Sequence, residues 1–184
     1  MNSILTGAVG GLAAGILIPS LNYFGQRLLN NWFLKIDIDE NDLLNLRVYS
    51  SISSLTNAIA YITVNNNKND IVQSIRIKES FCIGKVHDDR LSWSKNDDDS
   101  NFSEININPG EHQKLNLIRV HEEEGRTFIE IASEQGFFPT AKKPRIILAS
   151  NRDYKFDIKI TASNLFSKTK TFIYRYSTKT LVKS

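Results

Sequence analysis

Residues 154–160 read Tyr-Lys-Phe-Asp-Ile-Lys-Ile, with an apolar side chain at every second position. A period of two places the apolar side chains on one face of a β-strand and the charged side chains on the other. The stretch therefore predicts a half-buried strand, with one face against a core and the other in water.

The same period recurs through most of the chain after Lys35. Apolar residues recur at every second position within 36–38, 44–48, 75–77, 105–107, 115–117, 129–131, 146–148 and 172–176. Residues 56–64 carry apolar side chains on both faces of the predicted strand, which is typical of a central strand. Short runs rich in Asn, Gly, Pro and Ser separate these segments. The pattern predicts a mainly β fold, with an antiparallel β-sandwich as the expected architecture and a barrel as the alternative.

The N-terminal segment has a different composition. The first 26 residues carry no charged side chain, and residues 4–24 are almost all apolar or small. A helix of that length spans about 30 Å, the thickness of a bilayer's hydrocarbon core. We therefore expect residues 1–33 to form a transmembrane helix and its stem, and residues 34–184 to form a β domain. A cleaved signal peptide and a buried core helix stay open as alternatives.

Charge and cysteine content suggest an orientation. Arg27 and Lys35 flank only the C-terminal side of the apolar segment, and positive flanks tend to stay in the cytoplasm. Cys82 is the only cysteine, so the chain cannot form an internal disulfide, which fits a reducing compartment. We expect a single-pass protein of the cell membrane with its N-terminus outside and its β domain in the cytoplasm.

Small residues are spaced regularly along the predicted membrane helix. Gly7, Gly11 and Gly15 recur every fourth residue and would share one helix face. Such a face lets two helices approach closely. The spacing predicts self-association, and the opposing interpretation is that membrane helices are simply rich in glycine.

Charge is divided unevenly along the chain. Residues 36–135 hold 10 Lys and Arg against 18 Asp and Glu, whereas residues 136–184 hold 11 against 2. The basic third offers a candidate contact for anions or lipid headgroups. Anionic lipid, a nucleotide or nucleic acid, and a plain solvated face all remain open. The candidate residues are Lys142, Lys143, Arg145, Lys168 and Lys170.

No pattern in the sequence indicates catalysis. His87, His112 and His121 have no second His or Cys at the spacing of zinc ligands. The sequence holds no Gly-x-Ser-x-Gly nucleophile motif and no phosphate-binding glycine loop. We therefore predict a protein that is not an enzyme and that needs no cofactor or metal.

Several short motifs together resemble a known class of proteins. They are the uncharged glycine-rich N-terminus, the strand-like segments 34–39 and 46–48, the tripeptide 91–93, the turn at 107–110, the strand 154–160 ending in 162–164, and a final aromatic strand. The chain resembles small uncharacterised prokaryotic proteins with a membrane anchor and an immunoglobulin-like sandwich. The resemblance implies a fold and a topology, without the disulfide and tryptophan arrangement of antibody domains.

These observations favour a membrane-anchored, non-enzymatic interaction or sensing module whose helix self-associates. By analogy with the class it resembles, the helix would act as a membrane-disrupting effector in a prokaryotic antiviral defence or stress system. The alternative is a structural accessory subunit of a larger membrane complex. The expected partners are the lipid membrane and a second copy or another protein, with a nucleotide as a further ligand.

Overall fold

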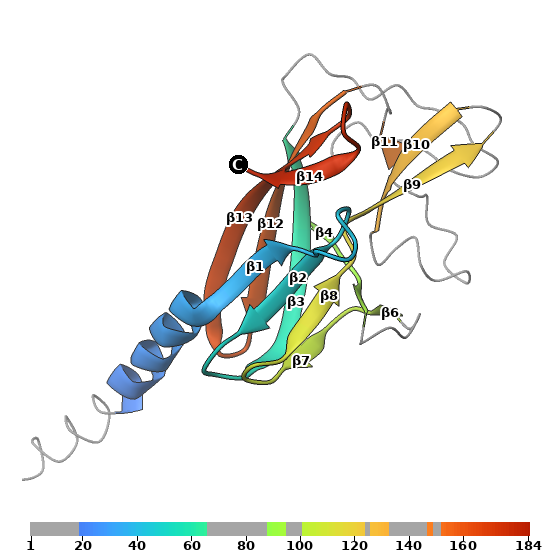
Figure 1. Cartoon of the computed structure of the whole chain (residues 1–184). Helices are drawn as coiled ribbons and strands as arrows, with labels where there is room; N and C mark the ends of the chain where they lie inside the picture. Colours follow the sequence, from blue (N-terminus) through green and yellow to red (C-terminus); the bar gives the residue numbers. More distant parts are fainter. Residues whose placement is uncertain (1–18, 66–87, 95–100, 124–125, 133–146, 149–151) are drawn as a thin grey trace, which may run out of the picture.

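The computed structural model describes residues 19–65, 88–94, 101–123, 126–132, 147–148 and 152–184 (Figure 1). The described chain is mainly β, and its paired strands run antiparallel. One helix, residues 19–33, precedes the first strand and extends away from the sheets. The predicted β-rich fold class is therefore confirmed.

The first sheet has five strands in the order β1-β2-β8-β5-β6. β1 forms one edge, and it follows the helix without a break. The strands are β1 (Leu34–Ile38), β2 (Leu46–Ser50), β5 (Trp93–Ser94), β6 (Asn101–Phe102) and β8 (His112–Leu115).

The second sheet has the order β14-β13-β12-β3-β4, and β7 also pairs with β3. Residues 56–64 were expected to form a central strand, and β3 does lie between β12 and β4, which confirms that prediction. The strands are β3 (Leu55–Asn65), β4 (Asp89–Arg90), β7 (Ile105–Ile107), β12 (Tyr154–Ala162), β13 (Leu165–Arg175) and β14 (Thr180–Lys183).

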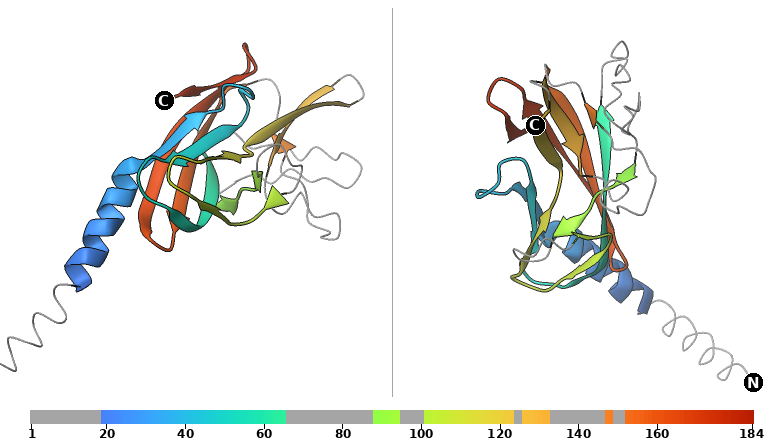
Figure 2. Two further views of the ribbon diagram at one scale, coloured as in Figure 1. Left: turned by 60° about the horizontal axis from the view of Figure 1, so that its bottom comes forward. Right: turned by 90° about the vertical axis from the view of Figure 1, so that its right-hand side faces the viewer.

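A third, smaller sheet stands to one side of the other two (Figure 1). Its order is β11-β10-β9. The left view of Figure 2 also shows this small sheet standing apart, on the side away from the helix. The strands are β9 (Ile118–Glu123), β10 (Arg126–Ile131) and β11 (Ile147–Leu148).

One cluster of buried apolar side chains takes members from all of β1, β2, β3, β12 and β13. In β12 the predicted alternation holds, since Tyr154, Phe156, Ile158 and Ile160 are all buried. Trp93 of β5 is completely buried in the same cluster. Burial of each such side chain contributes roughly 1.5–3 kcal/mol, so this shared core is what holds the two larger sheets together.

The predicted turn between β7 and β8 has a regular geometry. Glu111 N donates to Asn108 O at 3.1 Å, with Pro109 and Gly110 between them. Gly110 has a φ of 79°. Proline at the second position and a positive φ at the third are the features of a type II turn, so glycine is required at position 110 for backbone reasons.

Among the residues that the structure describes, we find no helix with the length and apolar character needed to span a bilayer. Residues 4–18 of the predicted membrane segment lie outside the described part of the chain. The described helix ends at residue 33 and β1 begins at Leu34. The membrane-spanning role of residues 1–33 stays a prediction.

Candidate functional site

The helix is attached to the β domain at the turn between β12 and β13. Arg27 Nη2 donates to Ser163 O at 2.6 Å, and Asn30 Nδ2 donates to Asn164 O at 2.6 Å. Positions three apart share one side of a helix, so both side chains reach the same turn. Asn30 is completely buried there. We call this contact, made by Arg27, Asn30, Ser163, Asn164 and Phe166, the junction.

Aromatic rings surround the charge of Arg27. Its guanidinium carbon lies 4.4 Å from the centroid of the Tyr23 ring and 5.6 Å from that of Phe166. Phe24 also stacks on Phe166, with ring centroids 6.1 Å apart. Each cation–π contact of this kind contributes roughly 0.5–2 kcal/mol, more when water is excluded. The first charged side chain of the sequence is therefore turned toward the β domain.

The turn is held from its other side by the connection between β2 and β3 and by the beginning of β3. Thr56 N donates to Asn164 Oδ1 at 3.1 Å, and Asn164 Nδ2 donates to Ser54 O at 2.8 Å. Ser163 N also donates to Thr56 O at 2.9 Å. Because the turn bonds both the helix and the β2–β3 connection, it fixes the direction of the helix relative to the sheets.

Lys168 of β13 caps the C-terminal end of the helix. Its Nζ donates to Asn31 O at 2.8 Å and to Leu34 O at 2.6 Å. The last carbonyls of a helix have no partner within the helix, and a cation there also meets the negative end of the helix dipole. Burial lowers the pKa of the Lys168 ammonium, and the positive charges of Lys35 and Lys170 lower it further.

Lys170 and Lys183 cover β1, the edge strand of the first sheet. Lys170 Nζ donates to Ile36 O at 2.6 Å and lies 3.3 Å from Asp37 Oδ1. Lys183 of β14 lies 2.8 Å from the same carboxylate oxygen. Burial acts to raise the pKa of Asp37, but the two lysines outweigh it and hold that pKa below its ordinary value. Pairing of this kind protects an edge strand from adding another strand.

The structure therefore places two of the predicted anion-binding residues and leaves the others undescribed. Lys168 and Lys170 lie together on β13, with their ammonium groups directed at β1 and the helix end. Binding of an anion or lipid by this pair stays a prediction. Lys142, Lys143 and Arg145, and the helix glycines Gly7, Gly11 and Gly15, lie outside the described residues.

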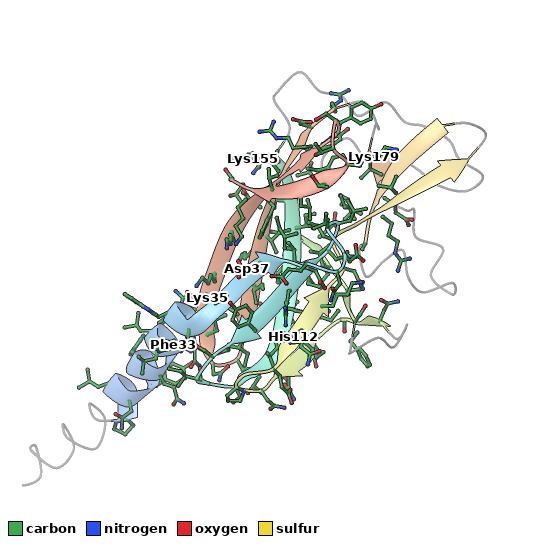
Figure 3. All side chains as sticks on the ribbon, in the orientation of Figure 1. Phe33, Lys35, Asp37, His112, Lys155 and Lys179 are labelled. Carbon is green, nitrogen blue, oxygen red and sulfur yellow. The ribbon has the colours of Figure 1, made fainter. Side chains whose placement is uncertain are left out.

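The basic residues that the structure describes are divided between two ends of the molecule. β12 runs from Lys155 to the junction at Ser163, a distance of about 26 Å for an extended strand. Lys155 and Lys179 lie at the end away from the helix, whereas Phe33 and Lys35 lie next to it (Figure 3). Lys168 lies at the helix end as well, so the described basic residues within 152–184 do not form a single patch.

The outward side of the helix is apolar. Leu21, Phe24, Leu28, Leu29 and Trp32 are between 54% and 77% exposed. At 3.6 residues per turn these five side chains cover an arc of about 140°, and Arg27 and Asn30 lie on the opposite side. Large exposed apolar surfaces of this kind mark contacts with a partner or a membrane. We call these five residues the outer arc. Phe24 forms its margin, because its ring is half exposed and also stacks on Phe166 of the junction.

A second candidate is a polar hollow of about 410 Å³ beside β8. Asp42 and Lys114 form an ion pair at 2.8 Å across it. Asn116 Nδ2 donates to Asn101 Oδ1 at 3.0 Å, and Asn45 Nδ2 donates to Asp42 Oδ2 at 2.7 Å. The hollow offers amide, carboxylate and ammonium groups to a polar ligand, which would have to compete with these internal bonds.

Within the described ranges, no three His, Cys, Asp or Glu side chains gather as a metal site would require. His112 Nδ1 lies 3.2 Å from Arg47 Nη2 on the exposed face of the first sheet. Cys82 and His87 lie outside the described residues.

Sequence reasoning did not identify the residues of the junction. Residues 162–164 were interpreted only as the end of a strand, and Asn30 only as part of the stem that follows the membrane helix. The available signal was the placement of Arg27 and Asn30 three residues apart, on the side of the helix opposite its large apolar residues. What they bond to, more than 130 residues away, has no signature in the sequence.

The chain was also compared with known proteins. No family model matches it, and neither the curated proteins nor the solved structures contain a significant match.

Proposed function

We propose that this protein is a membrane-anchored, non-enzymatic interaction or sensing module. The uncharged N-terminal segment spans the membrane with its N-terminus outside, and the β domain lies in the cytoplasm as an immunoglobulin-like sandwich. The observation that carries the proposal is the division of the helix into two sides. Its polar side is bonded to the β domain through Arg27 and Asn30, and its outer arc is apolar and exposed.

The proposed role of the junction is to pass a movement of the β domain on to the helix. A tether that is joined to its domain by a flexible linker cannot report what the domain binds. Here the helix end is bonded to β13 and to the β12–β13 turn. A ligand or partner that shifts the sheets would therefore also shift the helix. This requires that the ligand binds the shifted and the unshifted arrangement of the sheets with different affinity. The polar hollow beside β8 is the proposed contact surface for such a ligand, and a nucleotide is one candidate.

Alkaline carbonate extraction of membranes from cells that express the full chain tests the tether. We expect the protein to remain in the membrane pellet, because a spanning helix is not released by removing charge interactions. Recovery of the protein in the supernatant would contradict the proposal. N-terminal sequencing of the mature protein distinguishes an anchor from a cleaved signal peptide, since only cleavage removes Met1 together with the apolar run.

Self-association of the helix through Gly7, Gly11 and Gly15 is tested separately. We expect Gly11→Leu to reduce cross-linked oligomers in membranes and any toxicity of expression, because the larger side chain blocks close helix approach. Ala13→Leu is the matched control, since residue 13 falls on the other side of an ideal helix. An equal loss of cross-linked oligomers in both variants, or no loss in either, would argue against self-association through the glycine face.

The second candidate function is a structural accessory subunit of a larger membrane complex. The rigid attachment of the helix to the domain suits a docking role as well as a sensing role. Purification of the tagged full chain from its native membrane separates the two. A single stoichiometric protein partner favours the subunit, whereas a homo-oligomer favours the self-associating module and its role as a membrane effector in defence or stress.

A further inference from the structure

The sequence marks the end of the apolar segment at Arg27, the first charged residue. The structure shows that this charge is not on the outward side of the helix. Arg27 Nη2 bonds Ser163 O, and its guanidinium is placed between the rings of Tyr23 and Phe166. A charge held in this way does not oppose contact between the outer arc and lipid, because the guanidinium is turned to the β domain and its Nη2 is bonded there, although its buried Nε has no hydrogen-bond partner among the described residues.

The outer arc continues past Arg27 without interruption. Leu28, Leu29 and Trp32 are each more than half exposed. The intervening helical residues on the outward side, within the described part of the chain, are uncharged. Trp32 is eight residues beyond Phe24, where the apolar run of the sequence ends, which corresponds to about 12 Å along the helix axis.

We propose that the bilayer interface extends along the outer arc as far as Trp32, an inference that rests on the proposed membrane anchor. The β12–β13 turn and the β2–β3 connection then lie among lipid headgroups. Tryptophan is enriched at that depth of a membrane, where its ring is half in hydrocarbon and half in water. The tethered domain therefore sits directly on the membrane with a fixed face toward it.

The shape of the outer arc favours lipid over a second copy of the helix as the occupant. A coiled-coil partner covers two positions of every seven, which is a narrow seam. The outer arc is about 140° wide with Phe24 at its margin and about 100° wide without it, and the helix leads directly into the uncharged residues 1–18. Lipid surrounds an exposed helix over a wide arc, whereas a single partner helix leaves most of such an arc uncovered.

The β domain supplies a second apolar contact at the same end. Ile52 is 62% exposed in the connection between β2 and β3. That connection is bonded to the turn through Ser54 O, and Thr56 N at the beginning of β3 is bonded to the same turn. The turn itself is bonded to the helix. Because this connection and the helix are bonded to the same turn, we expect Ile52 to meet the same interface as the outer arc.

The two tryptophans make a direct test possible. Trp32 is exposed and Trp93 is completely buried. The full chain is reconstituted in phosphatidylcholine vesicles, with or without lipids brominated near the headgroup end of the acyl chains. We expect brominated lipid to reduce wild-type fluorescence by about two-fold, since one of two tryptophans meets lipid. The Trp32→Phe variant should lose little fluorescence in brominated lipid, and this substitution leaves the core unchanged.

A new reporter then tests the orientation of the domain. In the Trp32→Phe chain, we expect Ile52→Trp to restore quenching by shallow bromines. Leu43→Trp is the matched control, because Leu43 is comparably exposed but lies in the β1–β2 loop.

Flotation of the vesicles separates this inference from the anchor itself. Protein that floats with the vesicles and shows quenching at Trp32 supports both. Protein that floats but shows no quenching overturns the inference and leaves the anchor standing, which is the result expected if a second copy covers the outer arc. Protein that does not float with the vesicles overturns both.

Discussion

Single polar side chains hold the helix of this protein to its sheets. Asn30 is completely buried, and its Nδ2 donates to Asn164 O at 2.6 Å. The oxygen of the same amide has no hydrogen-bond partner in the structure. A buried amide that is only half satisfied is tolerated because the bond it does make replaces water at the turn carbonyl.

The contribution of Asn30 can be measured directly. We expect Asn30→Ala to lower the free energy of unfolding by about 1–3 kcal/mol, because Asn164 O would lose its partner. The measurement is thermal or urea unfolding of the full chain in detergent. Asn31→Ala is the control, since its buried side-chain oxygen has no partner to lose, and it should change stability by less than about 0.5 kcal/mol. Equal effects of the two substitutions would show that the junction bond contributes nothing of its own.

The carboxylate of Asp37 predicts how stability depends on pH. Its pKa is held below the ordinary value of 3.8, with burial opposing the shift and Lys183 and Lys170 causing it. A carboxyl whose pKa is lower in the folded than in the unfolded state stabilises the fold above the unfolded value. That contribution is lost as pH falls through the folded value. We therefore expect acid unfolding below about pH 4 to be steeper in wild type than in Asp37→Asn.

Unfolding midpoints measured at intervals from pH 6 down to acid test this sign. Asp42 also has a lowered pKa, with burial opposing and the hydrogen bond from Lys114 leading the shift. Some acid sensitivity should therefore remain in Asp37→Asn. A variant whose pH profile is identical to that of wild type would show that the two lysines do not act on Asp37 in solution.

At the scale of the elements, the same substitution is expected to have opposite effects in a turn and in the helix. Gly110 has a φ of 79° in the β7–β8 turn, whereas Gly25 lies within the helix. An added Cβ would meet nothing within 4 Å at either position. The difference is therefore a matter of backbone conformation alone.

We expect Gly110→Ala to destabilise the protein by about 1–2 kcal/mol, because an L side chain is strained at positive φ. Gly25→Ala should be neutral or stabilise it by up to about 1 kcal/mol, because alanine restricts the unfolded chain and favours helix. Differential scanning calorimetry of the two variants measures both. Destabilisation by Gly25→Ala would indicate that a partner approaches the helix closely at that position.

The elements also show where sequence patterns were sufficient. The alternation at residues 154–160 predicted β12 and its buried face, and Pro109-Gly110 predicted the turn before β8. The pattern missed the first half of β13, because Ser167, Lys168, Thr169, Lys170 and Thr171 are all polar. A strand segment at an edge can do without an apolar face when its side chains bond to a neighbouring sheet, and Lys168 and Lys170 do so.

At the scale of the whole molecule, the orientation of the domain across the membrane is the main prediction. Lys179 lies at a turn far from the helix (Figure 3). We expect Lys179→Cys, in a chain with Cys82→Ser, to resist a membrane-impermeant thiol reagent in intact cells and to react after lysis. The reason is that the positive flank of Arg27 and Lys35 keeps the domain in the cytoplasm. Labelling of intact cells would reverse the assigned topology.

The sequence by itself determined that the fold is mainly β, where β12 and the Pro109-Gly110 turn lie, and that the N-terminal segment is uncharged and apolar. These are local properties, because side-chain alternation and backbone preference act between residues that are neighbours in the chain. Only the tertiary structure decided that Arg27 faces the β domain and that Lys168 caps the helix. Both contacts join residues more than 130 positions apart, and nothing local records which distant carbonyl a side chain will meet once the sheets have packed on their common core.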